Sequence, residues 1–130
     1  MKTTTMALGA VAVLLTGCIH TNSVLLDPNG YYAPVPASEV RIFLAPEDVP
    51  YEYQDIALVH ADADEDWTNE ADLVEAIREE AASLGAHAVI LLWIEEPSGL
   101  ERLADAVVVH EDIARRRGQA VAIRRTGRRR

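Results

Sequence analysis

The chain has 130 residues, a formal net charge of −9 at pH 7 and one cysteine. This length is enough for one small domain and too short for two, and a lone cysteine excludes an intramolecular disulfide, so packing must hold the fold together. Residues 18–114 carry 21 Asp and Glu against 3 Arg, a formal charge of −18, whereas residues 115–130 carry 8 Arg and no acid. An acidic body of this kind argues against binding to nucleic acid.

The N-terminal segment has the pattern of an export signal. Lys2 precedes an apolar run over residues 6–15, which has the length of a secretory signal core rather than of a membrane-spanning helix. The run ends in LTGC (residues 15–18), which resembles the lipobox of bacterial lipoproteins. The resemblance implies cleavage between Gly17 and Cys18 and acyl chains on Cys18, which together would anchor the protein stably in a membrane. The alternatives are an uncleaved signal anchor and an ordinary signal with a chance cysteine.

The residue after the cysteine bears on location. In lipoproteins of double-membrane bacteria, an aspartate at this place often retains the protein at the inner membrane, and here the place is taken by Ile19. The resemblance therefore implies the outer membrane, with the protein facing the periplasm.

We expect four segments: a signal peptide over residues 1–17, a lipidated N-terminus and tether over 18–37, an α/β domain over 38–125 and a basic tail over 126–130. Prolines and an Asn-Gly pair interrupt any regular pattern before residue 37. About twenty extended residues could reach about 60 Å from the bilayer. The arginine-rich end could contact anionic headgroups, a partner's acidic surface or the chain's own acidic face, or it could be a solvated terminus.

The domain begins with two predicted strands, over residues 40–44 and 54–61, and alternation in the second puts Ile56 and Leu58 on one face. An acidic loop follows, and then a helix is predicted from about Glu70 to Leu84, with Thr68 or Asn69 as its N-cap and Gly85 closing it in a left-handed turn. One stripe at helical spacing is expected to be buried: Val74, Ile77, Ala81 and Leu84.

Residues 87–94 form a nearly unbroken apolar run, which predicts a strand covered on both faces. One helix can cover only one face. By alternation the second face carries Val89, Leu91 and Trp93, and it must be covered by another segment, a second subunit or a partner. We therefore take Leu91 and Trp93 as candidate interaction residues. Residues 99–117 fit a helix or, in part, a strand, and residues 119–125 alternate as a final strand.

The stretch EEAASLGAHAVILLWIEEPSG followed by RRRGQAVAIRR resembles the helix, Gly-Ala-Asx-Ala-Val strand and closing strand of small bacterial α/β domains, namely YbjQ-type and RcsF-like proteins. The resemblance covers about residues 40–125 and implies a periplasmic lipoprotein context. RcsF-like domains are held by disulfides that this chain cannot form, and His87 stands where Asn or Asp is usual. The expected fold is α+β in two layers, a small mixed sheet of about four strands on one main helix.

Candidate metal ligands lie in the acidic loop and at the ends of predicted strands. Three alternating aspartates imitate the start of an EF-hand loop, but Trp67 replaces the required glycine and Leu73 the bidentate glutamate. Three histidines could converge at one rim of the sheet, although no His-x-His or cysteine pattern supports them. The candidates are Asp62, Asp64, Asp66, His60, His87 and His110, and no cofactor is predicted.

No catalytic constellation is found. Ser23, Ser38, Ser83 and Ser98 lie outside any Gly-x-Ser-x-Gly turn, and no glycine-rich phosphate loop is present. The sequence therefore predicts a protein that is not an enzyme: a membrane-anchored envelope lipoprotein acting as a protein-interaction module, either a sensor or an assembly accessory, with an envelope protein or a second copy as partner. The alternative is a periplasmic domain that binds a small ligand or a divalent metal.

Overall fold

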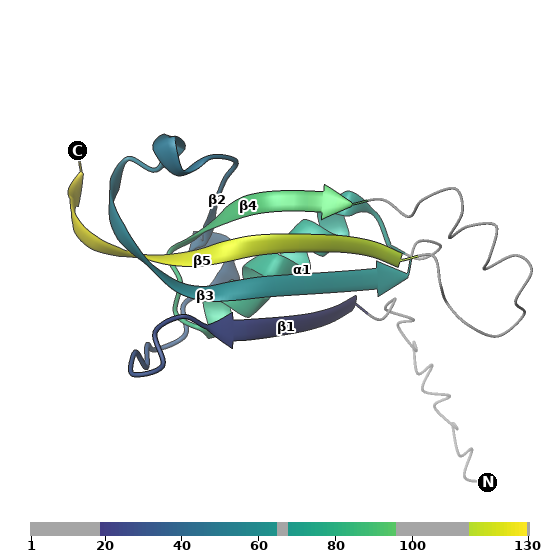
Figure 1. The fold of residues 1–130 in the computed structure, drawn as a ribbon, viewed down its shortest axis with the longest axis horizontal. Helices are drawn as coiled ribbons and strands as arrows, with labels where there is room; N and C mark the ends of the chain where they lie inside the picture. The colour runs from purple at the N-terminus through teal and green to yellow at the C-terminus, as the bar shows by residue number, and fades with distance from the viewer. Residues whose placement is uncertain (1–18, 65–67, 96–114, 130) are drawn as a thin grey trace, which may run out of the picture.

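The computed structural model describes residues 19–64, 68–95 and 115–129, which form one five-stranded mixed sheet and one α-helix (Figure 1). The strand order is β1-β3-β5-β4-β2, in which β2 and β4 are parallel and the other neighbours antiparallel. The predicted α+β class is confirmed. The elements are β1 (Ile19–Leu25), the 3-10 turn η1 (Ala37–Glu39), β2 (Arg41–Phe43), the 3-10 turn η2 (Pro46–Asp48), β3 (Tyr51–Asp64), α1 (Glu70–Ser83), β4 (Ala88–Glu95) and β5 (Arg115–Arg129).

Helix α1 begins and ends where the sequence predicts. The Asn69 side chain accepts a hydrogen bond from the backbone N–H of Asp72 (3.0 Å), and the Asp72 carboxylate accepts one from the N–H of Asn69 (2.9 Å), which together form a capping box. Gly85 closes the helix with φ +78°, where a Cβ would lie 2.6 Å from Cβ of Tyr32. No helix within the described ranges is long and apolar enough to cross a membrane.

The buried stripe of α1 differs from the prediction at its ends. The helix buries Leu73, Ile77, Ala81 and Ala82, whereas Val74 and Leu84 are half-buried. The strands beneath α1 carry small residues, all of them buried: Ala57, Ala61 and Ala63 of β3, and Ala120 and Ala122 of β5. At Gly118 a Cβ would lie 3.0 Å from Cδ2 of Leu73. These small residues let the helix lie close to the sheet, and Leu73 and Ile77 fill the space between them.

The predicted tether over residues 18–37 is wrong for the residues that the structure describes. Strand β1 pairs along its whole length with β3, from Ile19 opposite Ala63 to Leu25 opposite Ala57. The segment after β1 is also docked, since the Val35 N–H donates to the carbonyl of Ala82 (3.0 Å). The domain therefore begins by residue 19, and β1 brings the number of strands to five.

The final strand is longer than predicted at both ends. β5 begins at Arg115 and continues to Arg129, so residues 126–129, expected in a basic tail, form its end. β5 pairs with both β3 and β4 and is the centre of the sheet. Its neighbour β3 also runs beyond the predicted residues 54–61, to Tyr51 and Asp64.

Two register shifts change the predicted faces. The shift between Leu91 and Trp93 in β4 leaves Leu92 without a partner in β5, so Val89 and Leu91 lie on the helix side and Trp93 on the other. The prediction that these three residues share one face is therefore wrong. In β3 a shift between Asp55 and Ala57 brings Ile56 into the helix-side core, not onto the face of Leu58.

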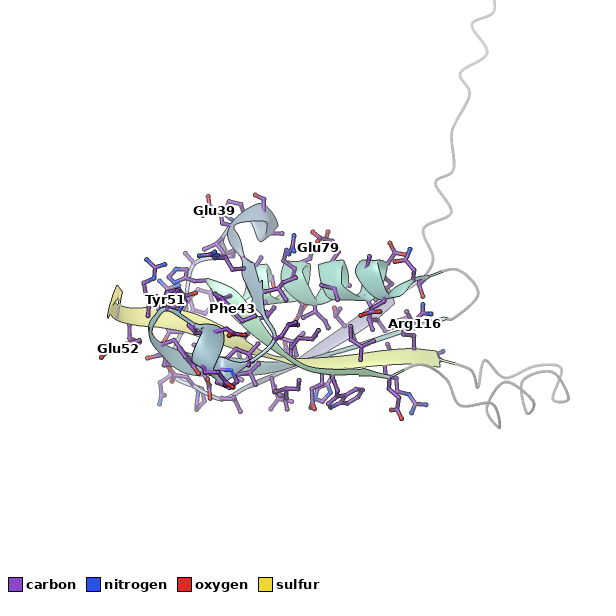
Figure 2. All side chains as sticks on the ribbon, turned by 90° about the horizontal axis from the view of Figure 1, so that it is seen from above. Glu39, Phe43, Tyr51, Glu52, Glu79 and Arg116 are labelled. Atoms are coloured by element: carbon purple, nitrogen blue, oxygen red, sulfur yellow. The ribbon has the colours of Figure 1, made fainter. Side chains whose placement is uncertain are left out.

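The face opposite α1 is covered at one end only among the described residues. The chain between β2 and β3, which contains η2, folds back over the sheet, and Val49 and Tyr51 pack on Ala88, Ile90 and Ile123. Figure 2 shows α1 on one side of the sheet and this shorter covering segment, near the labelled Phe43 and Tyr51, on the other. The remainder of that face has no described element over it.

Candidate functional site

We call the uncovered part of the sheet, opposite α1, the open face. The registers place its side chains in rows that cross the strands. The open face comprises Asn22 and Val24 of β1, Leu58 and His60 of β3, Gln119 and Val121 of β5, and Trp93 of β4.

The first row is apolar. Val24 lies opposite Leu58, Leu58 opposite Val121, and Val121 opposite Ile90, which is buried beneath the η2 segment. Val24 is 52% exposed, and Leu58 and Val121 are half-buried. The apolar surface of the covered end thus continues into an accessible strip that reaches the β1 edge.

The second row is polar and aromatic. Asn22, His60, Gln119 and Trp93 follow one another across the strands. Gln119 connects two of its neighbours: its Oε1 accepts a hydrogen bond from Nε1–H of Trp93 (2.9 Å), and its Nε2 lies 3.3 Å from Nε2 of His60. These contacts hold the indole, which is 41% exposed, in one orientation on the surface.

A third row, nearest the strand ends, is charged. His20 lies opposite Asp62, Asp62 opposite Arg117, and Arg117 opposite Glu95. Asp62 also accepts a hydrogen bond from Nη1 of Arg115 at 2.6 Å. From Asp62 through Arg117 to Glu95, opposite formal charges therefore alternate along this border of the open face, where exposed charges favour specificity more than stability.

The structure does not bring the predicted metal ligands together. His60 lies in the middle of the open face. His87, in contrast, directly precedes β4, at the end of the sheet away from the start of β1. Asp62 is engaged by Arg115, and Asp64 ends β3. Asp66 and His110 lie outside the described residues, as do the predicted lipidation residue Cys18 and Gly17 before it. Within the described ranges, no group of three or more His, Cys, Asp or Glu could hold a metal ion.

Of the two predicted interaction residues, one is on this surface. Trp93 lies on the open face, while Leu91 packs with the core beneath α1. Sequence reasoning missed Val24, Gln119 and Val121 as members of the face. Alternation in residues 119–125 places Gln119 and Val121 on the same face of their strand. Whether that face also carries Trp93 depends on the pairing register of β4 with β5, which the local sequence does not determine.

Comparisons with known proteins establish the fold and not a family. No protein-family model matches the chain, and no curated protein matches it in sequence. A solved structure that it resembles is a crystal structure of the Francisella virulence factor FvfA, with 16% sequence identity and a TM-score of 0.56. The alignment covers 80% of this chain and 96% of that one. At this identity the likeness supports a shared architecture, and functional roles do not transfer.

Proposed function

We propose that this chain is a bacterial envelope lipoprotein, anchored through Cys18 in the outer membrane and facing the periplasm, and that its domain binds a protein partner through the open face. The anchor rests on the lipobox-like LTGC sequence and on Ile19 as the following residue. The binding role rests on one observation, the aromatic and aliphatic surface opposite α1.

Several features of the open face suit protein binding. Trp93 presents a large, oriented aromatic surface, and tryptophan is enriched among residues that dominate binding energy. Beside it Leu92 is 49% exposed, and the apolar row with Val24 crosses the sheet. Asn22 and His60 lie in the row beside this apolar row, so apolar and polar groups adjoin on the open face. Protein interfaces combine apolar and polar groups in this way.

The position of β1 supports an anchored arrangement with a defined orientation. Because β1 begins at Ile19, lipidated Cys18 would be bonded directly to the first residue of the sheet, without a spacer. The sheet end that carries the start of β1 would then lie at the bilayer surface. The open face, which runs along the strands away from that end, would stay accessible from the periplasm.

A photo-crosslinking experiment in intact cells tests the proposal. A photoreactive amino acid replaces Trp93, and a matched one replaces Glu79, an exposed residue of α1 on the opposite side of the sheet (Figure 2). We expect one envelope protein to be captured from position 93 and not from position 79. Capture of only a second copy of the chain would identify self-association, and equal yields from both positions would contradict binding through the open face.

Two substitutions separate the surface from the anchor. Trp93→Ala should reduce recovery of the partner about tenfold or more, as for a central interface tryptophan. Leu44→Ala is the control, because Leu44 is 74% exposed and lies outside the open face. Cys18→Ala should abolish the incorporation of labelled palmitate into the protein without changing the fold of the domain. If Cys18→Ala still incorporates palmitate, or the parent chain incorporates none, the anchoring half of the proposal is wrong.

A further inference from the structure

A second site lies at the end of the sheet opposite the start of β1. A pocket of about 230 Å³ is lined by Val35, Glu39, Arg41, Tyr51, His87 and Arg125. These residues are far apart in the sequence, and the parallel pairing of β2 with β4 brings Arg41 beside the start of β4. The Arg41 N–H donates to the carbonyl of His87 (3.2 Å), and the His87 N–H donates to the carbonyl of Ile123 (2.9 Å). The backbone beneath the pocket is therefore fixed.

The guanidinium groups at this pocket are positioned by aromatic rings. Cζ of Arg125 lies 4.3 Å from the centroid of Tyr51, whose side chain is buried, and Cζ of Arg41 lies 5.7 Å from that of Phe43. Within the described ranges, neither arginine forms an ion pair with a carboxylate. Stacking on a ring leaves the planar N–H donors at the edge of the guanidinium open to an oxygen ligand.

A third arginine adds charge beside the pocket. Arg124 stacks on Tyr32, with Cζ 4.5 Å from the ring centroid, and its Nη1 donates to the carbonyl of Gly85 (2.6 Å). Two guanidinium groups, of Arg41 and Arg125, and one carboxylate, of Glu39, line the pocket, and the charge of Arg124 also acts on His87. The formal charge of the lining is thus +1, although the chain as a whole carries −9.

The histidine in the pocket is held as a donor. Nδ1 of His87 accepts a hydrogen bond from the backbone N–H of Arg125 (3.2 Å), which in the neutral ring leaves the proton on Nε2. Burial and the charges of Arg124 and Arg125 lower the pKa of His87, so the ring is neutral at pH 7. Nε2–H is then a donor that His87 can offer to a ligand.

We propose that this pocket binds a small oxyanion group, a phosphate or a carboxylate, through Arg41, Arg125 and His87. Fork-shaped guanidinium donors match the oxygens of these groups, and a neutral imidazole N–H completes the set. The inference is independent of the proposed function and concerns a different end of the sheet. The carboxylate of Glu39 repels an anionic ligand and so lowers the affinity of the site. Neutralising Glu39 should therefore strengthen binding.

Titration of the isotope-labelled protein with inorganic phosphate at pH 7 and fixed ionic strength tests this site. We expect the imidazole resonances of His87 to shift with saturation, and we expect Arg41→Gln and Arg125→Gln each to weaken binding about five- to tenfold. Glu39→Gln should strengthen it about twofold or more. Arg78→Gln, which removes an equal charge on α1, is the matched control and should leave the affinity unchanged.

If Arg125→Gln fails to fold because the Tyr51 ring loses its cover, Arg41→Gln and Glu39→Gln still decide the question, since both residues are exposed. Vesicles containing phosphatidic acid distinguish a lipid headgroup from a free anion: Arg41-dependent binding to the vesicles indicates the headgroup, and phosphate binding without vesicle binding indicates a soluble ligand. Absence of a His87 shift with both probes, or equal affinities in all variants, overturns the proposal.

Discussion

At the scale of single residues, His87 makes stability depend on pH in a defined direction. Its pKa in the folded protein is lowered by burial and by Arg124 and Arg125, so the unfolded chain binds its proton at a higher pH than the folded chain does. The contribution of neutral His87 to the free energy of unfolding is therefore fully present above the ordinary histidine pKa of about 6.5. It is lost as the pH falls through the pKa of His87 in the folded protein.

Urea unfolding between pH 7.5 and 5 measures this effect. We expect the free energy of unfolding to fall less steeply toward pH 5 in His87→Gln than in the parent chain. His20→Gln is the control, because His20 is exposed in β1. If the parent and His87→Gln show the same pH dependence, His87 does not carry the effect.

At the scale of elements, β1 is the strand on which sequence and structure differ most. Turn-forming residues after Leu25 led to the prediction of a tether, so this short edge strand was missed. The side chains of β1 alternate between contact with α1 and solvent. Oγ of Ser23 donates to Oε1 of Glu80 at 2.8 Å, and Oγ1 of Thr21 donates to Oε2 of Glu80 at 3.3 Å, so β1 is joined to α1 as well as to β3.

A strand and a tether respond differently to truncation. A chain that begins at Asp27 loses the pairing of β1 with β3, and we expect its free energy of unfolding to drop by at least about 2 kcal/mol, with a midpoint about 8 °C or more lower. A chain that begins at Ile19 keeps β1 and serves as the control in thermal melts. Equal midpoints for the two chains would show that residues 19–26 contribute nothing to the fold.

The elements that the sequence predicted well are those determined by local chemistry. The capping box at Asn69 and the left-handed Gly85 set the two ends of α1 through interactions between residues that are close in the sequence. An apolar run is likewise enough to indicate β4. The unpaired Leu92, by contrast, depends on how β4 aligns with β5, which is a contact between distant segments. Alternation alone therefore placed Leu91 and Trp93 on one face, and the candidate site was only half identified.

At the scale of the whole molecule, the two candidate sites occupy different places relative to the predicted anchor. The pocket formed by Arg41, His87 and Arg125 could not be predicted from the sequence, because the crossover from β2 to β4 brings these residues together. Along β3 the distance from Ala63, opposite Ile19, to Tyr51 at the pocket is up to about 40 Å at 3.3 Å per residue. An anchored domain would therefore hold the pocket away from the bilayer.

Fluorescence quenching by lipids that carry a headgroup spin label measures this orientation in vesicles containing the lipidated chain. A fluorophore at His20→Cys would lie within about 10 Å of the anchored residue, whereas one at Glu47→Cys, in η2, would lie at the far end of the sheet. Because no spacer separates Cys18 from β1, we expect strong quenching at position 20 and little at position 47. Similar quenching at both positions would mean that the domain lies along the bilayer or moves freely on its anchor, and the open face would then compete with lipid for its partner.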